Sequence, residues 1–368
     1  MGEIRLFESR DVAQAADLWQ RCFRKSLAHA TADLCQYFLE VFLGGPWHHP
    51  DYRPLVYLAS DGAITGFMGR VHRPMMYRGQ LIHCAVATQL MVDPARKQGF
   101  CALELVRAFH AGPHDLAYSD GANESSRRVW ERCGGQSCRL LSMEWKRPLR
   151  RVQSLLLRIG ENRTIGPLAR ALQPCSGLVD ELAVRSMPRL WHLPRSRLNC
   201  VAATPERLLH MFGPAQSQVS LTPVYTPQTL SWLLAKAAES RSLGDLRTMA
   251  VTDQSGCDVG WFVYYTRPGQ PAQVLQVGAL SGAGANVLGA LFHDAWEQGA
   301  ASVTGQLEAL LLTELSNAHC TFRCIGLGVL VQSRNPELLA AIHRGDAALS
   351  RLEGEWWMRF GIDRKAAW

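Results

Sequence analysis

The run from Arg96 to Cys101 has the residue types of an anion-binding loop. It follows an apolar stretch and reads Arg-Lys-Gln-Gly-Phe-Cys, with two cations and one glycine. A helix is predicted after it, because four apolar residues share one face at helical spacing: Ala102, Leu105, Val106 and Phe109. The first N–H groups of a helix have no partner within it, and the helix dipole adds positive charge there. The pattern therefore predicts a strand, a tight loop and a helix whose corner binds a phosphate or pyrophosphate.

The same six residues resemble the Arg/Gln-x-x-Gly-x-Gly/Ala loop of the GNAT acetyltransferases, which holds the pyrophosphate of acetyl-coenzyme A. Two features differ from the family. Cys101 stands where the family has a second Gly or Ala, and the loop after Pro94 is one residue shorter. Because cysteine is small, we expect the loop to keep its function. An ordinary strand-to-helix turn is the alternative interpretation of this motif taken alone.

A second stretch, Asn123 to Gly134, resembles the other GNAT signature, in which an Asn is followed seven residues later by an aromatic residue and further on by Gly. Asn123 is expected to cap a helix. In the family, a bulge in the strand before the loop splays that strand from its neighbour and exposes backbone groups to the pantetheine arm. The resemblance thus implies an acetyl-CoA site made of Leu90, Met91, Val92, Arg96, Lys97, Gln98, Gly99, Phe100, Cys101, Asn123, Ser126 and Trp130.

Acetyl transfer in this family goes by direct attack of an amine on the thioester, and the enzyme mainly positions the two substrates. A backbone N–H near Val92 is expected to polarise the carbonyl. The usual proton-transfer groups are missing: Trp130 stands where the family often has Tyr, and no Asp or Glu lies between Ala63 and Val92. The catalytic candidates are His83, Asp120 and Tyr118, with His48, His49 and Asp51 as further polar residues and the Cys84 thiol as a less favoured nucleophile.

Three functions are compatible with these residues. The first is an acetyl-CoA-dependent N-acetyltransferase acting on a small-molecule or sugar-like amine. The second is a non-catalytic acyl-CoA-binding or scaffold protein, suggested by Trp130 and by the missing Glu. The third is an O-acyltransferase acting on a polysaccharide or its precursor, which ranks below because a hydroxyl needs a stronger base than the sequence offers.

Composition is that of a folded protein of two domains, with 368 residues, 47% hydrophobic and 19% charged. No apolar run approaches the roughly 20 residues of a membrane span, and the N-terminus has no signal-peptide pattern, so we expect a cytoplasmic location. Eleven cysteines without a Cys-x-x-Cys pair indicate reduced thiols and no metal site. The net charge of +7 reflects coding bias or attraction to anions such as coenzyme A, and no basic-aromatic stripe indicates nucleic acid. A monomer and a homodimer are both compatible.

The elements that must position these residues are predicted in the family order over 1–147: strands at 4–8, 55–60, 63–71, 81–92, 115–119 and 139–145, and helices at 12–23, 31–43, 102–110 and 123–133. Asp61-Gly62 indicates a hairpin. Residues 148–195 are predicted to form a basic helical linker, for which packing on the lobes is favoured over a membrane surface.

Residues 196–368 repeat this order more weakly. Strands are predicted at 247–252, 258–266, 273–280, 301–306, 324–332 and 355–360, and helices at 227–240, 286–298, 308–317 and 336–344. The glycine-rich turn Gly282-Ala283-Gly284 has no cation nearby, so tight helix packing is favoured over ligand binding. The predicted fold class is α/β (α+β): two GNAT-like lobes, the second degenerate, each with a mixed, mostly antiparallel twisted sheet flanked by helices.

Overall fold

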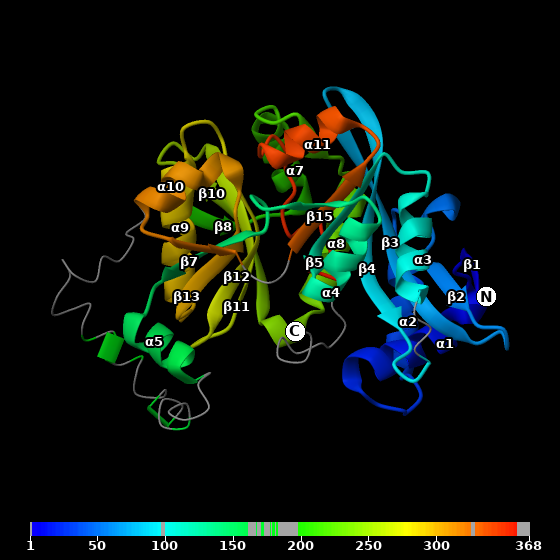
Figure 1. The fold of residues 1–368 in the computed structure, drawn as a ribbon. Helices are drawn as coiled ribbons and strands as arrows, with labels where there is room; N and C mark the ends of the chain where they lie inside the picture. The colour runs from blue at the N-terminus through cyan, green and yellow to red at the C-terminus, as the bar shows by residue number, and fades with distance from the viewer. Residues whose placement is uncertain are drawn as a thin grey trace. The chain divides into compact units, whose positions relative to one another are not determined.

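The computed structural model describes residues 2–96, 100–160, 198–324 and 328–358, with the isolated positions 167, 171, 172, 177, 179, 180 and 182. The chain divides into two compact units. The first unit comprises Met1–Ser142, Val219–Ser242 and Cys324–Trp368, and the second comprises Met143–Gln218 and Leu243–Arg323. Each contains a mostly antiparallel sheet that includes a parallel strand pair, with helices along it (Figure 1). The predicted fold class is therefore confirmed.

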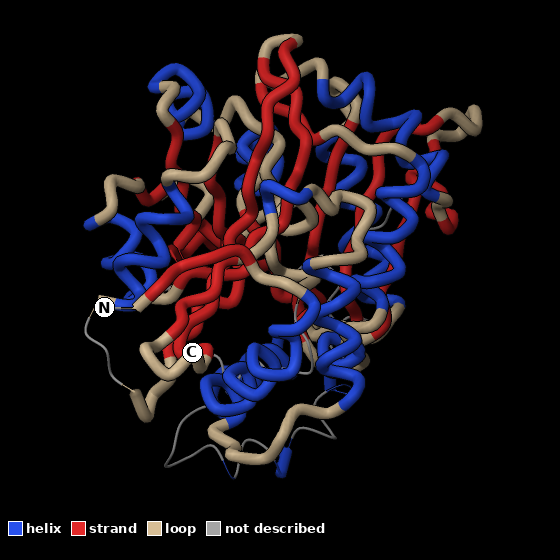
Figure 2. The backbone as a smooth tube through the Cα atoms, turned by 90° about the vertical axis from the view of Figure 1, so that its right-hand side faces the viewer, coloured by secondary structure: helices blue, strands red, loops and turns tan. Residues whose placement is uncertain are grey.

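The sheet of the first unit has the order β1-β2-β3-β4-β5-β15-β6, and the short β9 pairs with β3. Its strands are β1 (Glu3–Leu6), β2 (Leu55–Leu58), β3 (Ile64–Tyr77), β4 (Gln80–Val92), β5 (Leu116–Ala122), β6 (Gln136–Cys138), β9 (Leu221–Pro223) and β15 (Gly328–Ser333). The long β3–β4 hairpin reaches beyond its neighbours, with its tip at the top of both views (Figures 1 and 2). Gly62 takes a φ of 79° in the predicted hairpin turn between β2 and β3.

Helices cover both faces of this sheet. They are α1 (Val12–Trp19), the π-helical turn η2 (Gln20–Arg24), α2 (Ala32–Phe42), α3 (Cys101–His110), α4 (Glu124–Arg132), α8 (Pro227–Ala238) and α11 (Pro336–His343), with the short η1 (Ser9–Asp11) and η3 (Pro50–Tyr52). Successive residues of a strand point to opposite faces. Met68 accordingly joins the core under α3 and α4, whereas the ring of Phe67 packs against those of Phe38 and Phe42 from α2.

The second unit has the strand order β14-β7-β13-β12-β11-β10-β8. Its strands are β7 (Met143–Pro148), β8 (Asn199–Ala202), β10 (Asp245–Thr252), β11 (Asp258–Thr266), β12 (Pro271–Ala279), β13 (Ser302–Gln306) and β14 (Thr321–Cys324). Its helices are α5 (Arg151–Gly160), α7 (Pro205–Gln216), α9 (Gly284–Glu297), α10 (Leu312–Asn317) and the short η5 (Ala309–Leu311), and η4 (Arg241–Leu243) lies where the chain passes from the first unit to the second.

The two halves of the chain exchange one strand each. β15, from late in the chain, lies between β5 and β6 and is antiparallel to both. β7, from the first half, lies between β13 and β14 in the other sheet. This exchange, together with the segment Val219–Ser242 in the first unit, makes the compact units discontinuous in sequence, whereas the lobes were predicted at 1–147 and 196–368. Most of the predicted linker 148–195 lies outside the described residues, apart from α5 and a few single positions.

The strand predicted at 355–360 is wrong. Residues 351–357 form consecutive turns that belong to the first unit, and 359–360 lie outside the described residues. Two backbone hydrogen bonds close these turns: the N–H of Glu353 donates to the carbonyl of Ser350 (3.1 Å), and that of Met358 donates to the carbonyl of Glu355 (3.0 Å). An extended strand cannot make such short-range bonds.

Two further expectations concern the described residues. None of the helices in these ranges is both long and apolar enough to cross a lipid bilayer. Ten cysteines are described, and all are free thiols. Cys84 is 1% exposed, and burial raises the pKa of its thiol to about 12, so it is a poor nucleophile at neutral pH.

Replacing a core residue of β15 tests whether this late strand completes the first sheet. Leu330 is 1% exposed and packs in the core with Trp130, so Leu330→Ala is expected to lower the free energy of unfolding by roughly 2–5 kcal/mol. The matched control is Leu310→Ala, whose side chain is 52% exposed and whose effect should stay within about 0.5 kcal/mol. Urea unfolding measures both, and equal effects would contradict the placement of β15.

Candidate active site

The site begins where β4 and β5 stop pairing. These parallel strands pair only from Cys84–Val86 to Leu116–Tyr118. Immediately afterwards the register between β3 and β4 shifts: Phe67 pairs with Met91 and Gly69 with Thr88, so Gln89 and Leu90 together face Met68. This is the β-bulge that the resemblance implied, and Gln89 adopts the left-handed φ of 50° there. Beyond the bulge, β4 no longer follows β5.

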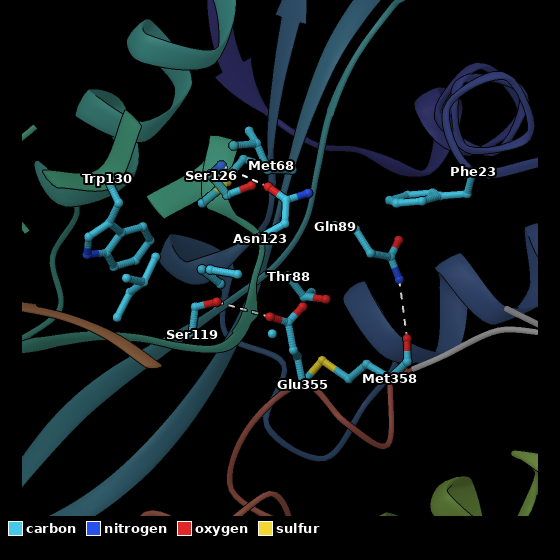
Figure 3. A pocket seen from close by; sticks show the side chains of 15 residues that line it. Phe23, Met68, Thr88, Gln89, Ser119, Asn123, Ser126, Trp130, Glu355 and Met358 are labelled. Atoms are coloured by element: carbon cyan, nitrogen blue, oxygen red, sulfur yellow. Dashed lines mark hydrogen bonds between the residues drawn. The ribbon is translucent and has the colours of Figure 1, made fainter. Parts of the chain in front are cut away.

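A cavity of about 130 Å³ lies at this divergence. Its walls come mainly from β4, β5 and the α4 region: Ala87, Thr88, Gln89 and Leu90 of β4, Ser119, Gly121 and Ala122 of β5, and Asn123, Ser126 and Trp130 of α4 and its cap. The remaining lining residues are Phe23 of η2, Met68 of β3, Leu330 of β15, and Glu355 and Met358 of the C-terminal turns. Figure 3 shows side chains from these segments around one space. All of them belong to the first unit.

Four of the predicted cofactor residues line this cavity: Leu90, Asn123, Ser126 and Trp130. The predicted cap of α4 is present, because Asn123 Oδ1 accepts a hydrogen bond from the N–H of Ser126 at 2.9 Å. Trp130 is 3% exposed, and its indole N–H donates to the carbonyl of Val331 at 3.3 Å. This hydrogen bond of the indole links α4 to β15.

Of the other predicted cofactor residues, those that the structure describes lie apart from the cavity lining. Met91 is 1% exposed, and the carbonyl of Val92 accepts from the Cys22 thiol at 3.4 Å. Phe100 is largely exposed, and burial raises the pKa of Cys101 to about 12. Arg96 lies on the surface in an ion pair with Asp61 at 2.7 Å. Lys97, Gln98 and Gly99, the centre of the predicted anion-binding loop, lie outside the described residues.

The three catalytic candidates fall in different places. His83 belongs to a cluster of rings away from the cavity lining, where its Nδ1 lies 2.9 Å from His72 Nε2 and its ring lies near that of Tyr52. Tyr118 is fully buried and does not line the cavity. Asp120 is 4% exposed and supports the cavity wall, because its Oδ1 accepts the N–H of Glu355 at 2.7 Å.

Glu355 is the acidic side chain that sequence reasoning missed. It lines the cavity, and its Oε1 accepts a hydrogen bond from the Ser119 hydroxyl at 3.0 Å (Figure 3). Two glycines make room for it. A Cβ at Gly121 would lie 2.7 Å from Glu355 Oε1, and a Cβ at Gly354 would overlap the Asp120 carboxyl. Nothing local in the sequence shows which sheet the turn at Gly354 joins.

A buried polar network holds the turn that carries Glu355. Glu353, 3% exposed, accepts hydrogen bonds from the Tyr225 hydroxyl (2.7 Å) and from the N–H of Ser350 (2.8 Å). Burial raises the pKa of this carboxyl. Arg73 donates from Nη2 to the carbonyl of Leu352 at 2.8 Å. Hydrogen bonds between buried groups of this kind favour one conformation, because breaking any of them leaves a buried partner unpaired.

The end of the same turn is tied to the other wall of the cavity. Tyr37 donates its hydroxyl proton to the carbonyl of Met358 at 2.5 Å, and Gln89 donates from Nε2 to the Tyr37 oxygen at 2.9 Å. The bulged strand, α2 and the C-terminal turn are thus linked through one carbonyl. The cavity therefore has a fixed shape on the side of Glu355.

The parallel strands of the second unit also pair over a short stretch. β12 and β13 pair in parallel only from Pro271 to Gln273, and β12 carries an extra residue at Leu275. The Trp261 ring lies over Gly278 and donates from Nε1 to Gln276 Oε1 at 2.8 Å.

At the start of α9, a Cβ on Gly284 would lie 3.0 Å from Leu311 and 3.2 Å from Glu314. The glycine-rich turn thus packs closely, and an acidic side chain lies where an anion-binding corner needs positive charge.

The fold is that of GCN5-related N-acetyltransferases. One similar solved structure is a GCN5-related N-acetyltransferase from Anabaena variabilis, with a TM-score of 0.59 and 10% identity over 91% of this chain and 73% of that one. A second is a probable N-acyltransferase of unknown function from Enterococcus faecalis, with a TM-score of 0.57 and 10% identity over 90% of this chain and 73% of that one. A third is a GCN5-related N-acetyltransferase from Kribbella flavida, with a TM-score of 0.56 and 13% identity over 93% of this chain and 73% of that one. No family model matches the sequence, and no curated protein matches it. The fold implied by the resemblance is confirmed.

Gly354→Ala tests the packing that places Glu355. The added methyl group would overlap the Asp120 carboxyl, so we expect a loss of about 1–3 kcal/mol in the free energy of unfolding. Gly289→Ala is the control, because a Cβ there meets open space on helix α9 and alanine favours the helix by up to about 1 kcal/mol. Thermal unfolding compares the two. A neutral Gly354→Ala would mean that the turn lies elsewhere.

The ring cluster around His83 predicts acid sensitivity. Burial, with the nearby His83, lowers the pKa of His72 to about 4 from its ordinary 6.5. Between these pH values the unfolded chain binds a proton that the folded protein does not, so stability falls as the pH drops from about 6.5 to 4. His72→Gln should remove on the order of 1 kcal/mol of this fall, allowing for partial exposure. Urea unfolding at pH 7 and pH 5 measures it.

The control for this measurement is Leu27→Ala, because that side chain is 90% exposed and carries no titratable group, so the pH dependence should stay unchanged. If His72→Gln and the parent protein lose stability equally between pH 7 and pH 5, His72 does not stay neutral in the folded state.

Proposed function

We propose that this chain is an acyltransferase that moves an acetyl group from acetyl-CoA to the nitrogen of an amine. The observation that carries the proposal is the cavity at the divergence of β4 and β5, bordered by the N-terminal end of α4 and by the Glu355 carboxylate. The names of the similar structures from Anabaena variabilis and Kribbella flavida support the same chemistry.

The cofactor is proposed to use the residues that the resemblance implied. The bulged segment Thr88–Leu90 offers backbone groups to the pantetheine arm, because a bulge leaves the ladder interrupted there. Arg96, with Lys97, Gln98 and Gly99, is proposed to bind the pyrophosphate. Arg96 is available for this role, because its ion pair with Asp61 is exposed to solvent, where such pairs are weak.

Proton transfer is assigned to Glu355. In the proposed reaction the lone pair of the amine attacks the thioester carbonyl carbon, the carbon–sulfur bond breaks, and the sulfur leaves as a thiolate. The proton that the nitrogen loses goes to the Glu355 carboxylate. Ser119 orients that carboxylate by its hydrogen bond, and Asp120 positions it through the backbone N–H. We prefer Glu355 to His83 and Tyr118, because neither of those lines the cavity.

In this proposal Trp130 does not donate a proton to the leaving sulfur, because its indole N–H already donates a hydrogen bond to the carbonyl of Val331. The backbone N–H groups at the bulge are the proposed donors to the thioester oxygen as charge develops on it. A site of this kind works mainly by positioning its two substrates.

Glu355→Gln tests the proposed base. The amide keeps the size of the side chain but cannot accept the proton, so kcat/KM for an amine at pH 7 should fall by roughly 10²–10⁴-fold while the Kd for acetyl-CoA stays the same. Release of the CoA thiol and calorimetry measure the two quantities. Glu337→Gln is the control, because that side chain is 71% exposed and is not among the residues that line the cavity.

The outcomes separate the candidate functions. No binding of acetyl-CoA at millimolar concentration by the parent protein would reject the proposal. Binding without thiol release for a broad panel of amines would support a non-catalytic acyl-CoA-binding protein, and release with hydroxyl compounds alone would support O-acyl transfer. An active Glu355→Gln would move the base to another residue.

A further inference from the structure

The cavity has two chemically different ends. Asn123, Ser126 and Trp130 of the α4 region form one end, and Phe23 and Met358 form the other, with Glu355 between them (Figure 3). The α4 end is the side proposed for the cofactor. The end at Phe23 and Met358 is then left for the molecule that receives the acyl group.

Phe23 is held in place by its neighbours in the turn η2. On one side of it, Cys22 donates to the carbonyl of Val92 (3.4 Å), and Arg21 donates to Asp93 Oδ2 (3.0 Å), so the turn is tied to the end of β4. The fully buried Trp19 lies behind, with its ring centroid 5.5 Å from that of Phe23. The phenyl ring therefore meets an incoming molecule in a preformed position.

The charge of the cavity is limited to one group. Of the described residues that line it, Glu355 alone carries a charged side chain. Asp120 does not supply a second anion to the space, because it is 4% exposed and its carboxyl packs against Gly354. The other lining side chains are uncharged, and they include the polar Thr88, Gln89 and Ser119 as well as the apolar Met358. One ammonium group thus finds a carboxylate partner, and a second would find no carboxylate among these residues.

We propose that the acceptor is a monoamine whose amino group lies at Glu355 and whose flat, apolar body packs on Phe23. This rests on the proposed acyl transfer at the same cavity. Polyamines are disfavoured, because a second ammonium group would be desolvated without a carboxylate partner, which lowers kcat/KM by roughly 10- to 100-fold. Amino sugars are disfavoured, because they have no flat apolar face to pack on Phe23. A flat ring gains from contact with Phe23 and with the methionine sulfur.

The test measures thiol release from acetyl-CoA with phenethylamine, ethylamine, glucosamine and spermidine. The parent protein should favour phenethylamine over glucosamine and spermidine by at least about tenfold in kcat/KM. Phe23→Ala should lower kcat/KM for phenethylamine roughly tenfold, mainly through KM, and leave ethylamine nearly unchanged, because ethylamine has no ring to lose contact. Phe23→Tyr should retain most of the preference.

Leu27→Ala is the matched control, because Leu27 follows the same helical turn and is 90% exposed. It should leave all four amines unchanged. A preference for glucosamine or spermidine, or equal losses for phenethylamine and ethylamine in Phe23→Ala, would overturn the monoamine proposal while leaving acyl transfer intact. Absence of thiol release with every amine would instead remove the proposed function, and this inference with it.

Discussion

The ladder between β4 and β5 is only three residue pairs long, and the site depends on where it stops. Had the two strands continued in parallel, their backbone groups would pair with each other and no space would open. The bulge at Gln89 and Leu90 prevents this, at the cost of a left-handed backbone in a residue that has a side chain. Backbone groups at such a break must find other partners, which is why it suits a ligand with its own amides.

A second constraint acts from the end of the described chain. The turn with Glu355 is fastened through Glu353, Tyr225 and Arg73 on one side and through Met358 on the other. A carboxylate that is to accept a proton has to be held at one place, and fixed hydrogen bonds achieve this without covering the carboxylate itself. The buried network thus fixes a wall whose Glu355 carboxylate lines the cavity.

Residue patterns in the sequence predicted local structure such as turns and helix caps, but they did not predict which distant segments pair. Asp61-Gly62 and the cap at Asn123 depend on neighbouring residues, so the β2–β3 turn and α4 could be predicted from them. Strands were predicted at 139–145 and 324–332, near the observed β7 and β15. The residue pattern of such a strand does not show which sheet it joins, because an apolar strand can pair with any apolar sheet edge. Glu355 was missed for the same reason: its partners Ser119 and Asp120 are distant in sequence.

The exchange of β7 and β15 also has a consequence for biosynthesis. β5 and β6 are synthesised long before β15. The edges of β5 and β6 that pair with β15 therefore stay unpaired while the rest of the chain is translated. Pairings between segments so far apart form slowly, and exposed edges invite aggregation in the interval. Successful production of this protein in a foreign host should therefore depend on chaperones and on a low translation rate.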